Sequence, residues 1–174
     1  MRQVLSLLVV LTLTSCYHLG EIRPTAMRAV RTLAIPTFRN TTLVPRTEVL
    51  LANITIRAFQ TDGTYRIVPE DQADAILQCR LTDVSRAPIL SSTTNIFQTQ
   101  QFQLQIQVQY DVIDRITGSV LQSGAATGQT TYFVGADRFS TFVGTDLTSD
   151  ERQALPLAGH AMAISLMSQL TQGW

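Results

Sequence analysis

The stretch QFQLQIQVQYDV, residues 101–112, decides the fold class of this chain. Its even positions are apolar, and five of its six odd positions are glutamine: Gln101, Gln103, Gln105, Gln107 and Gln109. A period of two residues is typical of a strand with one buried face and one face toward water. An open strand edge with this alternation would invite pairing with other chains. We therefore expect a long strand that lies inside its sheet rather than at the edge.

The segment that follows predicts an antiparallel partner for this strand. Residues 114–118, DRITG, are typical of a hairpin turn, and residues 120–132 return as the next strand. Within that return, Gly124 and Gly128 indicate a bulge or a close approach of another part of the chain.

The segment that precedes the glutamine-rich stretch predicts a further strand. Apolar residues alternate with more polar ones over residues 73–86. Cys79 lies within this alternation, and we interpret it as a small buried apolar residue. Pro88 and the Ser/Thr-rich residues 91–95 are expected to form a loop.

Two segments have the periodicity of helices that bury one face. The first, residues 46–62, stops before Gly63, and the second, residues 149–170, begins at Ser149, which can cap it. Pro156 lies near the start of the second helix and predicts a kink or a later start. The buried face of the first helix is predicted to contain Val49, Ala52, Ile56 and Phe59, widened by Leu50 and Ile54. The buried stripe of the second is predicted to contain Leu155, Ala158, Met162 and Leu166.

Two short strands complete the pattern, at residues 32–35 and 65–68, each followed by a proline. Residues 70–72 read as a turn and residues 135–148 as a loop. The order of elements predicts an α+β fold, in which two helices pack on one face of a mixed, mostly antiparallel sheet of four to five strands. The other face of the sheet is then free.

The N-terminus predicts a lipoprotein signal. Residues 4–13 are almost uninterruptedly apolar, too short to span a bilayer, and Leu13-Thr14-Ser15-Cys16 matches the lipobox. We therefore expect a signal peptide at residues 1–15, a diacylglycerol on Cys16, a lipidated tether at residues 16–31 and a single domain at residues 32–172. Two or three acyl chains would hold the mature chain on a membrane, with no remaining segment that crosses it.

Composition argues against a nucleic-acid binder. The chain has 13 basic residues, all arginine, and 13 acidic ones, so it is near neutral and has no basic excess. Codon usage explains the absence of lysine at least as well as a need for bidentate contacts does.

No motif in the sequence indicates catalysis, a cofactor or a metal. Asp71 with Asp74, or Asp111 with Asp114, could be considered as acid/base pairs, but acidic residues are common in turns and at strand ends. A metal site built from His160, Asp146 and Glu151 is the weaker interpretation, and a partly exposed helix histidine is the simpler one. His18 lies beside the predicted anchor and its role is open. We predict a protein that is not an enzyme.

The row of glutamines has two interpretations. It is either a plain solvated sheet face or a surface that packs against a polar protein wall. In the second case, uncharged hydrogen-bonding groups avoid the cost of burying charge.

Several short motifs, in order along the chain, resemble the LptE-type family of lipopolysaccharide-assembly lipoproteins. They include Cys16-Tyr17-His18-Leu19, residues 33–42 (LAIPTFRNTT), residues 63–68 (GTYRIV), residues 73–77 (ADAIL) and residues 114–118 (DRITG). The resemblance implies a subunit on the periplasmic side of the outer membrane. There it plugs and helps assemble a β-barrel translocon of the LptD type, and supports insertion of lipopolysaccharide into the outer leaflet.

The resemblance also suggests where lipopolysaccharide would be contacted. Some family members carry a basic residue after an Ile-Phe pair, but here Ile96-Phe97 is followed by Gln98. Arg86 and Arg115 are then the candidates for pairing with lipid A phosphates, with solvated loop arginines as the alternative. Two other functions stay open: a different periplasmic lipoprotein adaptor, such as a cell-wall synthase activator or secretion accessory, and a hydrolase with an unrecognised site.

Overall fold

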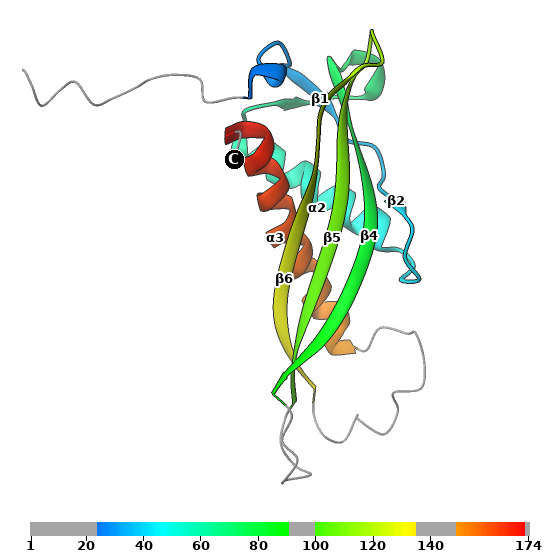
Figure 1. Ribbon diagram of the computed structural model, residues 1–174, viewed down its shortest axis with the longest axis vertical. Helices are drawn as coiled ribbons and strands as arrows, with labels where there is room; N and C mark the ends of the chain where they lie inside the picture. Colours follow the sequence, from blue (N-terminus) through cyan, green and yellow to red (C-terminus); the bar gives the residue numbers. More distant parts are fainter. Residues whose placement is uncertain (1–23, 91–99, 135–148, 173–174) are drawn as a thin grey trace, which may run out of the picture.

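The computed structural model describes residues 24–90, 100–134 and 149–172 and contains two long helices and a mixed sheet (Figure 1). The elements in chain order are η1 (Thr25–Met27), β1 (Thr32–Ala34), β2 (Arg39–Asn40), α2 (Thr47–Asp62), β3 (Arg66–Ile67), η2 (Glu70–Gln72), β4 (Ala75–Leu90), β5 (Gln100–Asp114), β6 (Val120–Val134) and α3 (Ser149–Gln172). The predicted signal peptide, with Cys16 and His18, and the predicted loops at 91–95 and 135–148 lie outside the described residues.

The α+β class is confirmed, with six strands where four to five were expected. The sheet order is β3-β1-β4-β5-β6, and β2 pairs with β4. The short strands β1 and β2 run parallel to β4, whereas β4, β5 and β6 form a long antiparallel meander. Both helices lie on one side of this meander, as predicted (Figure 1).

The glutamine-rich strand β5 lies between β4 and β6, so the prediction of a central strand is confirmed. Its even residues are buried under the helices: Leu104, Ile106, Val108, Tyr110 and Val112 are at most 2% exposed. The predicted turn between β5 and β6 is also present. Asp114 accepts hydrogen bonds from the backbone N–H groups of Ile116 and Thr117, and Gly118 has φ +70°.

A bulge in β4 changes which residues face the helices. Before it, Ala75, Leu77, Cys79 and Leu81 point to the core, and the register then shifts between Leu81 and Asp83. After the shift, the even residues of β4 lie opposite the even, helix-facing residues of β5, so Arg86 is paired with Leu104.

The prediction that Pro88 lies in a loop is wrong, because β4 continues through it to Leu90. Pro88 pairs with Phe102 on the β5 side, and no described strand lies along the other side of β4 at this point. A proline is tolerated there because its missing N–H would point away from β5.

The predicted buried face of the first helix is confirmed in part. Ala52 and Phe59 are buried, and Leu50 and Ile56 pack against the core, but Val49 is 52% exposed. The centre of the buried face is shifted toward Thr47, Leu51 and Thr55, and the apolar pattern could not mark the two threonines as core positions. The helix begins at Thr47, directly after Arg46 with φ +64°.

The second helix, α3, covers β5 and β6, and its predicted stripe is confirmed, since Leu155, Ala158, Met162 and Leu166 are at most 4% exposed. It begins at Ser149, so Pro156 lies inside it and does not mark a later start. A Cβ atom on Gly128 of β6 would lie 2.1 Å from the carbonyl oxygen of Ala158 and 2.2 Å from the nitrogen of Met162. The predicted close approach at Gly128 is therefore the contact of the helix backbone with the sheet.

The C-terminal end of α3 is held by hydrogen bonds from distant elements. Tyr65 donates to the Leu170 carbonyl at 2.7 Å, and Tyr110 donates to the Gln169 side chain at 2.9 Å. The structured region also reaches further toward the N-terminus than the predicted domain start, because Met27 and Val30, within the predicted tether, are buried in the core. Among the described residues, no helix has both the length and the apolar character needed to cross a membrane.

Candidate functional site

The uncovered face of the meander carries the glutamine row, which we call the glutamine face: Gln101, Gln103, Gln105, Gln107 and Gln109 of β5. Gln105 and Gln109 are exposed and the other three are half-buried by their neighbours. Across the strands, Gln105 lies opposite Gln129, and the Gln103 amide donates to the Gln129 side chain at 2.5 Å. The row therefore offers amide groups for hydrogen bonding, and one of them, Gln103, is already bonded across to β6.

Charge is distributed unevenly around this face. On its β6 side the neighbours are Ala125, Thr127, Gln129 and Thr131, and β6 contains no charged residue at all. Among the described residues, charge enters on the β4 side, where Arg80 lies opposite Gln109 and Asp83 lies opposite Gln107, and at the turn end of β5 with Asp111. Arg39 and Glu70 line the same pocket as Gln109, Arg80 and Asp111. The polar residues of β6 were not predicted to belong to this surface, although their uncharged alternation is visible in the sequence.

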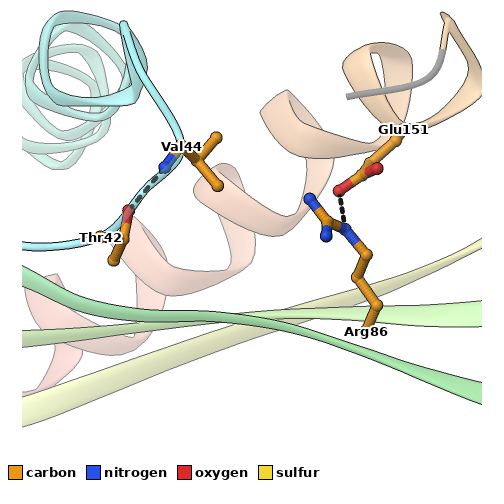
Figure 2. A network of polar contacts seen from close by, with 4 residues as sticks. All are labelled: Thr42, Val44, Arg86 and Glu151. Carbon is orange, nitrogen blue, oxygen red and sulfur yellow. Dashed lines mark hydrogen bonds and ion pairs between the residues drawn. The ribbon is translucent and has the colours of Figure 1, made fainter. Parts of the chain in front are cut away.

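Arg86 lies on the opposite, helix-facing side of the sheet. Its guanidinium forms an ion pair with Glu151 in the first turn of α3 (Figure 2). The Glu151 side chain is 1% exposed and that of Arg86 is 34% exposed. The pair joins the far half of β4 to the start of α3, a role that no local pattern in the sequence indicated.

Arg115 lies at the other end of the meander, in the β5–β6 turn. Its Nε atom donates to the Ala73 carbonyl at 2.6 Å, and its backbone N–H donates to the Asp74 carbonyl at 3.0 Å. Arg86 lies opposite Leu104, whereas Arg115 follows the end of β5 at Asp114, so most of β5 separates them and the structure does not bring them into one site.

Two of the four carboxylates considered as acid/base pairs, Asp74 and Asp114, have structural partners. Asp74 accepts hydrogen bonds from the backbone N–H groups of Arg31 and Thr32, at 2.9 and 2.8 Å, and these bonds lower its pKa below the usual value. Asp114 organises the hairpin turn, and the N–H of Thr117 lowers its pKa in the same way. Asp71 lies in η2, and Asp111 lies on the exposed face of β5.

The proposed metal ligands do not converge. Glu151 points to the sheet, whereas His160, half a helical turn out of phase with it, is exposed on the outer side of α3. His160 lines a groove of about 620 Å³ between α2 and α3, together with Ile54, Leu157, Ile164 and Met167. Asp146 lies outside the described residues. Within the described ranges, no three His, Cys, Asp or Glu residues gather to hold a metal.

Cys79 is buried and has no disulfide partner among the described residues, as the sequence predicted for a small apolar core residue. Burial raises the pKa of its thiol far above the usual value, so the reactive thiolate is scarce at neutral pH.

The sequence motif at residues 33–42, LAIPTFRNTT, has a structural role through Asn40. The Asn40 side chain donates to the carbonyl of Val44 at 2.7 Å and to the hydroxyl of Thr47 at 3.2 Å. Its oxygen accepts from the backbone N–H of Thr42 at 2.9 Å. Asn40 therefore shapes the loop that leads from β2 into α2.

A comparison with protein families gives a match over most of the chain. The sequence model of the family LptE, described as lipopolysaccharide-assembly, matches residues 30–172. No curated protein matches the chain closely enough to be taken as a relative.

Solved structures with a similar fold include XCC0632 from Xanthomonas campestris, with 12% identity, TM-score 0.56 and coverage of 82% of this chain and 85% of that chain. The PelC dodecamer from Paraburkholderia phytofirmans has 18% identity, TM-score 0.50 and coverages of 86% and 92%. A putative lipoprotein from Caulobacter crescentus has 14% identity, TM-score 0.50 and coverages of 78% and 89%. At these identities the similarity shows a shared fold alone.

Proposed function

Since this chain belongs to the LptE family of lipopolysaccharide-assembly proteins, we propose that it is an outer-membrane lipoprotein that plugs and helps assemble the β-barrel translocon for lipopolysaccharide. Its partner is a barrel of the LptD type, and it supports insertion of lipopolysaccharide into the outer leaflet. Cys16 carries the lipid anchor, and the domain lies on the periplasmic side of the membrane.

The observation that carries this proposal is the uncharged glutamine face. The interior of an outer-membrane barrel is polar, so a plug must present groups that can exchange hydrogen bonds with the wall. Burying a charge against such a wall costs far more than burying an amide that finds a partner. The five glutamines of β5 and the β6 residues beside them provide amides, hydroxyls and small side chains, and the charge on β5 lies at its turn end, at Asp111.

The same domain needs no reactive centre for this role. Asp74 and Asp114 are committed to backbone hydrogen bonds, and the buried Cys79 thiol has a raised pKa. We therefore propose a function by binding, with no catalysis and no cofactor.

Of the two arginines, Arg115 is the better candidate for a lipid A phosphate. Its side chain is exposed, and the charge of Arg115 acts on the nearby carboxylates of Asp74 and Asp114, but no buried carboxylate holds it as Glu151 holds Arg86. Arg86 would have to leave the buried Glu151 carboxylate before it could bind a phosphate.

Co-purification tests the proposal. The native chain, extracted with mild detergent, should bring down a β-barrel protein in near-stoichiometric amount. The double substitution Gln105→Glu and Gln107→Glu places charge on the glutamine face and should reduce the amount of co-purified barrel at least tenfold. The matched control, Gln60→Glu with Gln153→Glu, places the same charges on exposed helix positions and should retain the barrel.

Recovery of the native chain without a barrel would overturn the proposal, as would equal loss of the barrel in both double variants. Recovery of a different periplasmic partner would instead favour the adaptor function. In a separate test, Cys16→Ala should release the chain from membranes and remove the incorporation of radiolabelled palmitate. Turnover of a substrate by the purified chain would contradict a function by binding alone.

A further inference from the structure

A charged pocket borders the glutamine face on its β4 side. It has a volume of about 340 Å³ and lies where β2 runs beside β4 (Figure 1). Four charged side chains line it, one from each of four elements: Arg39 of β2, Glu70 of η2, Arg80 of β4 and Asp111 of β5. All four are exposed, and their charges sum to zero. Because they come from distant parts of the chain, only the folded sheet brings them together.

The two arginines lie on the same side of the sheet as the glutamine row. Arg80 lies between Cys79 and Leu81, which are buried under the helices, so its side chain points to the uncovered face. Arg39 follows Phe38, which is 3% exposed and belongs to the core, so its side chain also points to the uncovered face. A surface that covers the glutamine row would therefore meet both guanidiniums.

The fold places these two positive charges directly beside each other. Arg39 pairs with Arg80 across β2 and β4, and Arg80 lies opposite Gln109 across β4 and β5. Neighbouring strands are about 4.8 Å apart, and like charges that face each other across them destabilise the sheet. Within the described ranges, neither guanidinium forms an ion pair or a hydrogen bond. The domain therefore gives this arginine pair no bonded counter-ion of its own.

The two carboxylates lie nearer the turn that joins β5 to β6. Asp111 pairs with Gln78, which is two residues, or about 7 Å, from Arg80 along the same face of β4. Glu70 lies in η2, shortly before β4 begins at Ala75, and Ala75 is opposite the last residue of β5. The pocket is therefore positive at one end and negative at the other.

We propose that the charged pocket fixes the rotation of the plug in its barrel by accepting two opposite charges from the inner wall. A carboxylate of the wall lies between Arg39 and Arg80, and a lysine or arginine of the wall lies against Glu70 and Asp111. The inference rests on the proposed function, since it assumes that a barrel wall covers the glutamine face. It adds that the wall carries an acidic and a basic residue close together on its inner side.

The positive end of the pocket has the chemistry to bind a carboxylate. Two guanidiniums that share one carboxylate can donate several charge-assisted hydrogen bonds to it, and the carboxylate also reduces the repulsion between the arginines. Gln78 and Gln109 line the same pocket and add amide donors. The ion pairs form at the border of the contact, where water still reaches, so they avoid most of the cost of burying charge at its centre.

The pocket can set an orientation because it lies on one border of the face alone. The opposite border is β6, which has no charged residue. An uncharged face can exchange hydrogen bonds with a polar wall in several rotations. A wall that places a basic residue against Arg39 and Arg80, in contrast, would repel the plug. The rotation that brings both pairs of opposite charges together is therefore favoured over the others.

Charge reversal in the full lipidated chain tests the pocket. Arg39→Glu with Arg80→Glu should lower the amount of barrel recovered in mild detergent by about tenfold or more. The matched control, Arg57→Glu with Arg152→Glu, makes the same change of charge at exposed positions of α2 and α3 and should retain the barrel. Circular dichroism checks that both double variants are folded.

Neutral substitutions separate partner binding from folding. Arg39→Gln with Arg80→Gln relieves the like charges, so the isolated chain should unfold at a temperature no lower than that of the unsubstituted chain. The same variant should still lose barrel, because it no longer binds the wall carboxylate. A purely structural role of the arginines would instead lower the unfolding temperature.

A photo-crosslinking side chain in place of Gln78 identifies the wall residues. It should crosslink to a barrel peptide that carries an acidic and a basic residue close together. Exchange of that acidic residue for arginine should restore barrel recovery by the chain with Arg39→Glu and Arg80→Glu, and should lower recovery by the unsubstituted chain.

Full recovery of the barrel by the charge-reversed chain would overturn the inference and leave the proposed function in place. The same holds if position 78 crosslinks to no barrel residue while a crosslinker at Gln105 does. Absence of a barrel from the unsubstituted chain would overturn the proposed function, and this inference with it.

Glycerophosphoethanolamine, which carries one phosphate and one ammonium group, probes a small zwitterion as the occupant instead. Its binding to the native chain in calorimetry, lost on charge reversal while barrel recovery stays unchanged, would also overturn the inference.

Discussion

Gly128→Ala should be the most damaging single-methyl substitution in the sheet. The new Cβ atom would lie 2.1 Å from the carbonyl oxygen of Ala158, 2.2 Å from the nitrogen of Met162 and 2.7 Å from its Cα. All three atoms belong to the backbone of α3, so no side chain can rotate away to make room. The helix itself must move away from β6.

The size of the effect follows from that movement. Relieving the contact to the Ala158 oxygen requires a shift of about 1 Å, and a gap of that size removes roughly a quarter to half of the dispersion energy at each affected contact. Ala158, Met162 and Leu166 all pack through this surface. Overpacking of a core typically costs about 1–3 kcal/mol, and we expect about 3 kcal/mol here because the obstruction is backbone.

Thermal unfolding in detergent, followed by circular dichroism, measures this cost. For a domain of this size about 3 kcal/mol corresponds to a decrease in Tm of roughly 6–12 °C. Gly118→Ala is the control: it also adds one methyl group, at φ +70°, with no atom within 4 Å of the new Cβ. It should cost about 1–2 kcal/mol through backbone strain alone. If Gly128→Ala unfolds no earlier than Gly118→Ala, the helix does not approach the sheet at this glycine and the reasoning is wrong.

Three further outcomes are expected. Arg86→Ala should lower the free energy of unfolding by about 2 kcal/mol in urea titrations, because it removes the ion-pair partner of the buried Glu151 carboxylate. Arg80 forms no ion pair with any described residue, so the control Arg80→Ala should change this free energy by less than about 0.5 kcal/mol. Cys79 should react with a maleimide at neutral pH only as fast as the chain unfolds, because burial raises the pKa of its thiol; rapid labelling of the folded chain would show that the site is open. Asp74→Asn should reduce the loss of stability on acidification below about pH 4. The pKa of the Asp74 carboxyl is lower in the folded chain than in the unfolded chain, so this carboxylate stabilises the fold above the unfolded-state pKa and loses that effect as the pH falls through the folded-state pKa. An unchanged pH dependence of stability would contradict this.

Part of the fold could be predicted because it depends on local periodicity. The alternation in β5 marked its buried and exposed faces, and the stripe from Leu155 to Leu166 marked the buried side of α3. Each pattern reports which side of one element faces apolar surroundings, and this depends on the chain's own geometry. The turn at Asp114 and the close approach at Gly128 were also predictable from local sequence. Asp commonly bonds the backbone N–H groups of a turn, and Gly, which has no Cβ atom, allows another backbone to come close.

Other features were decided only when the elements packed together. The bulge at Thr82 changes the face of β4 on which Arg86 lies, and this places its guanidinium beside Glu151, 65 residues away in the sequence. The buried threonines of α2, the position of β6 at the edge and the separation of Arg86 from Arg115 also depend on which elements meet. Hydrophobic periodicity in a single sequence indicates which residues of an element are buried and which are exposed. It does not encode which distant segment each residue contacts, because that depends on how the elements pack against one another.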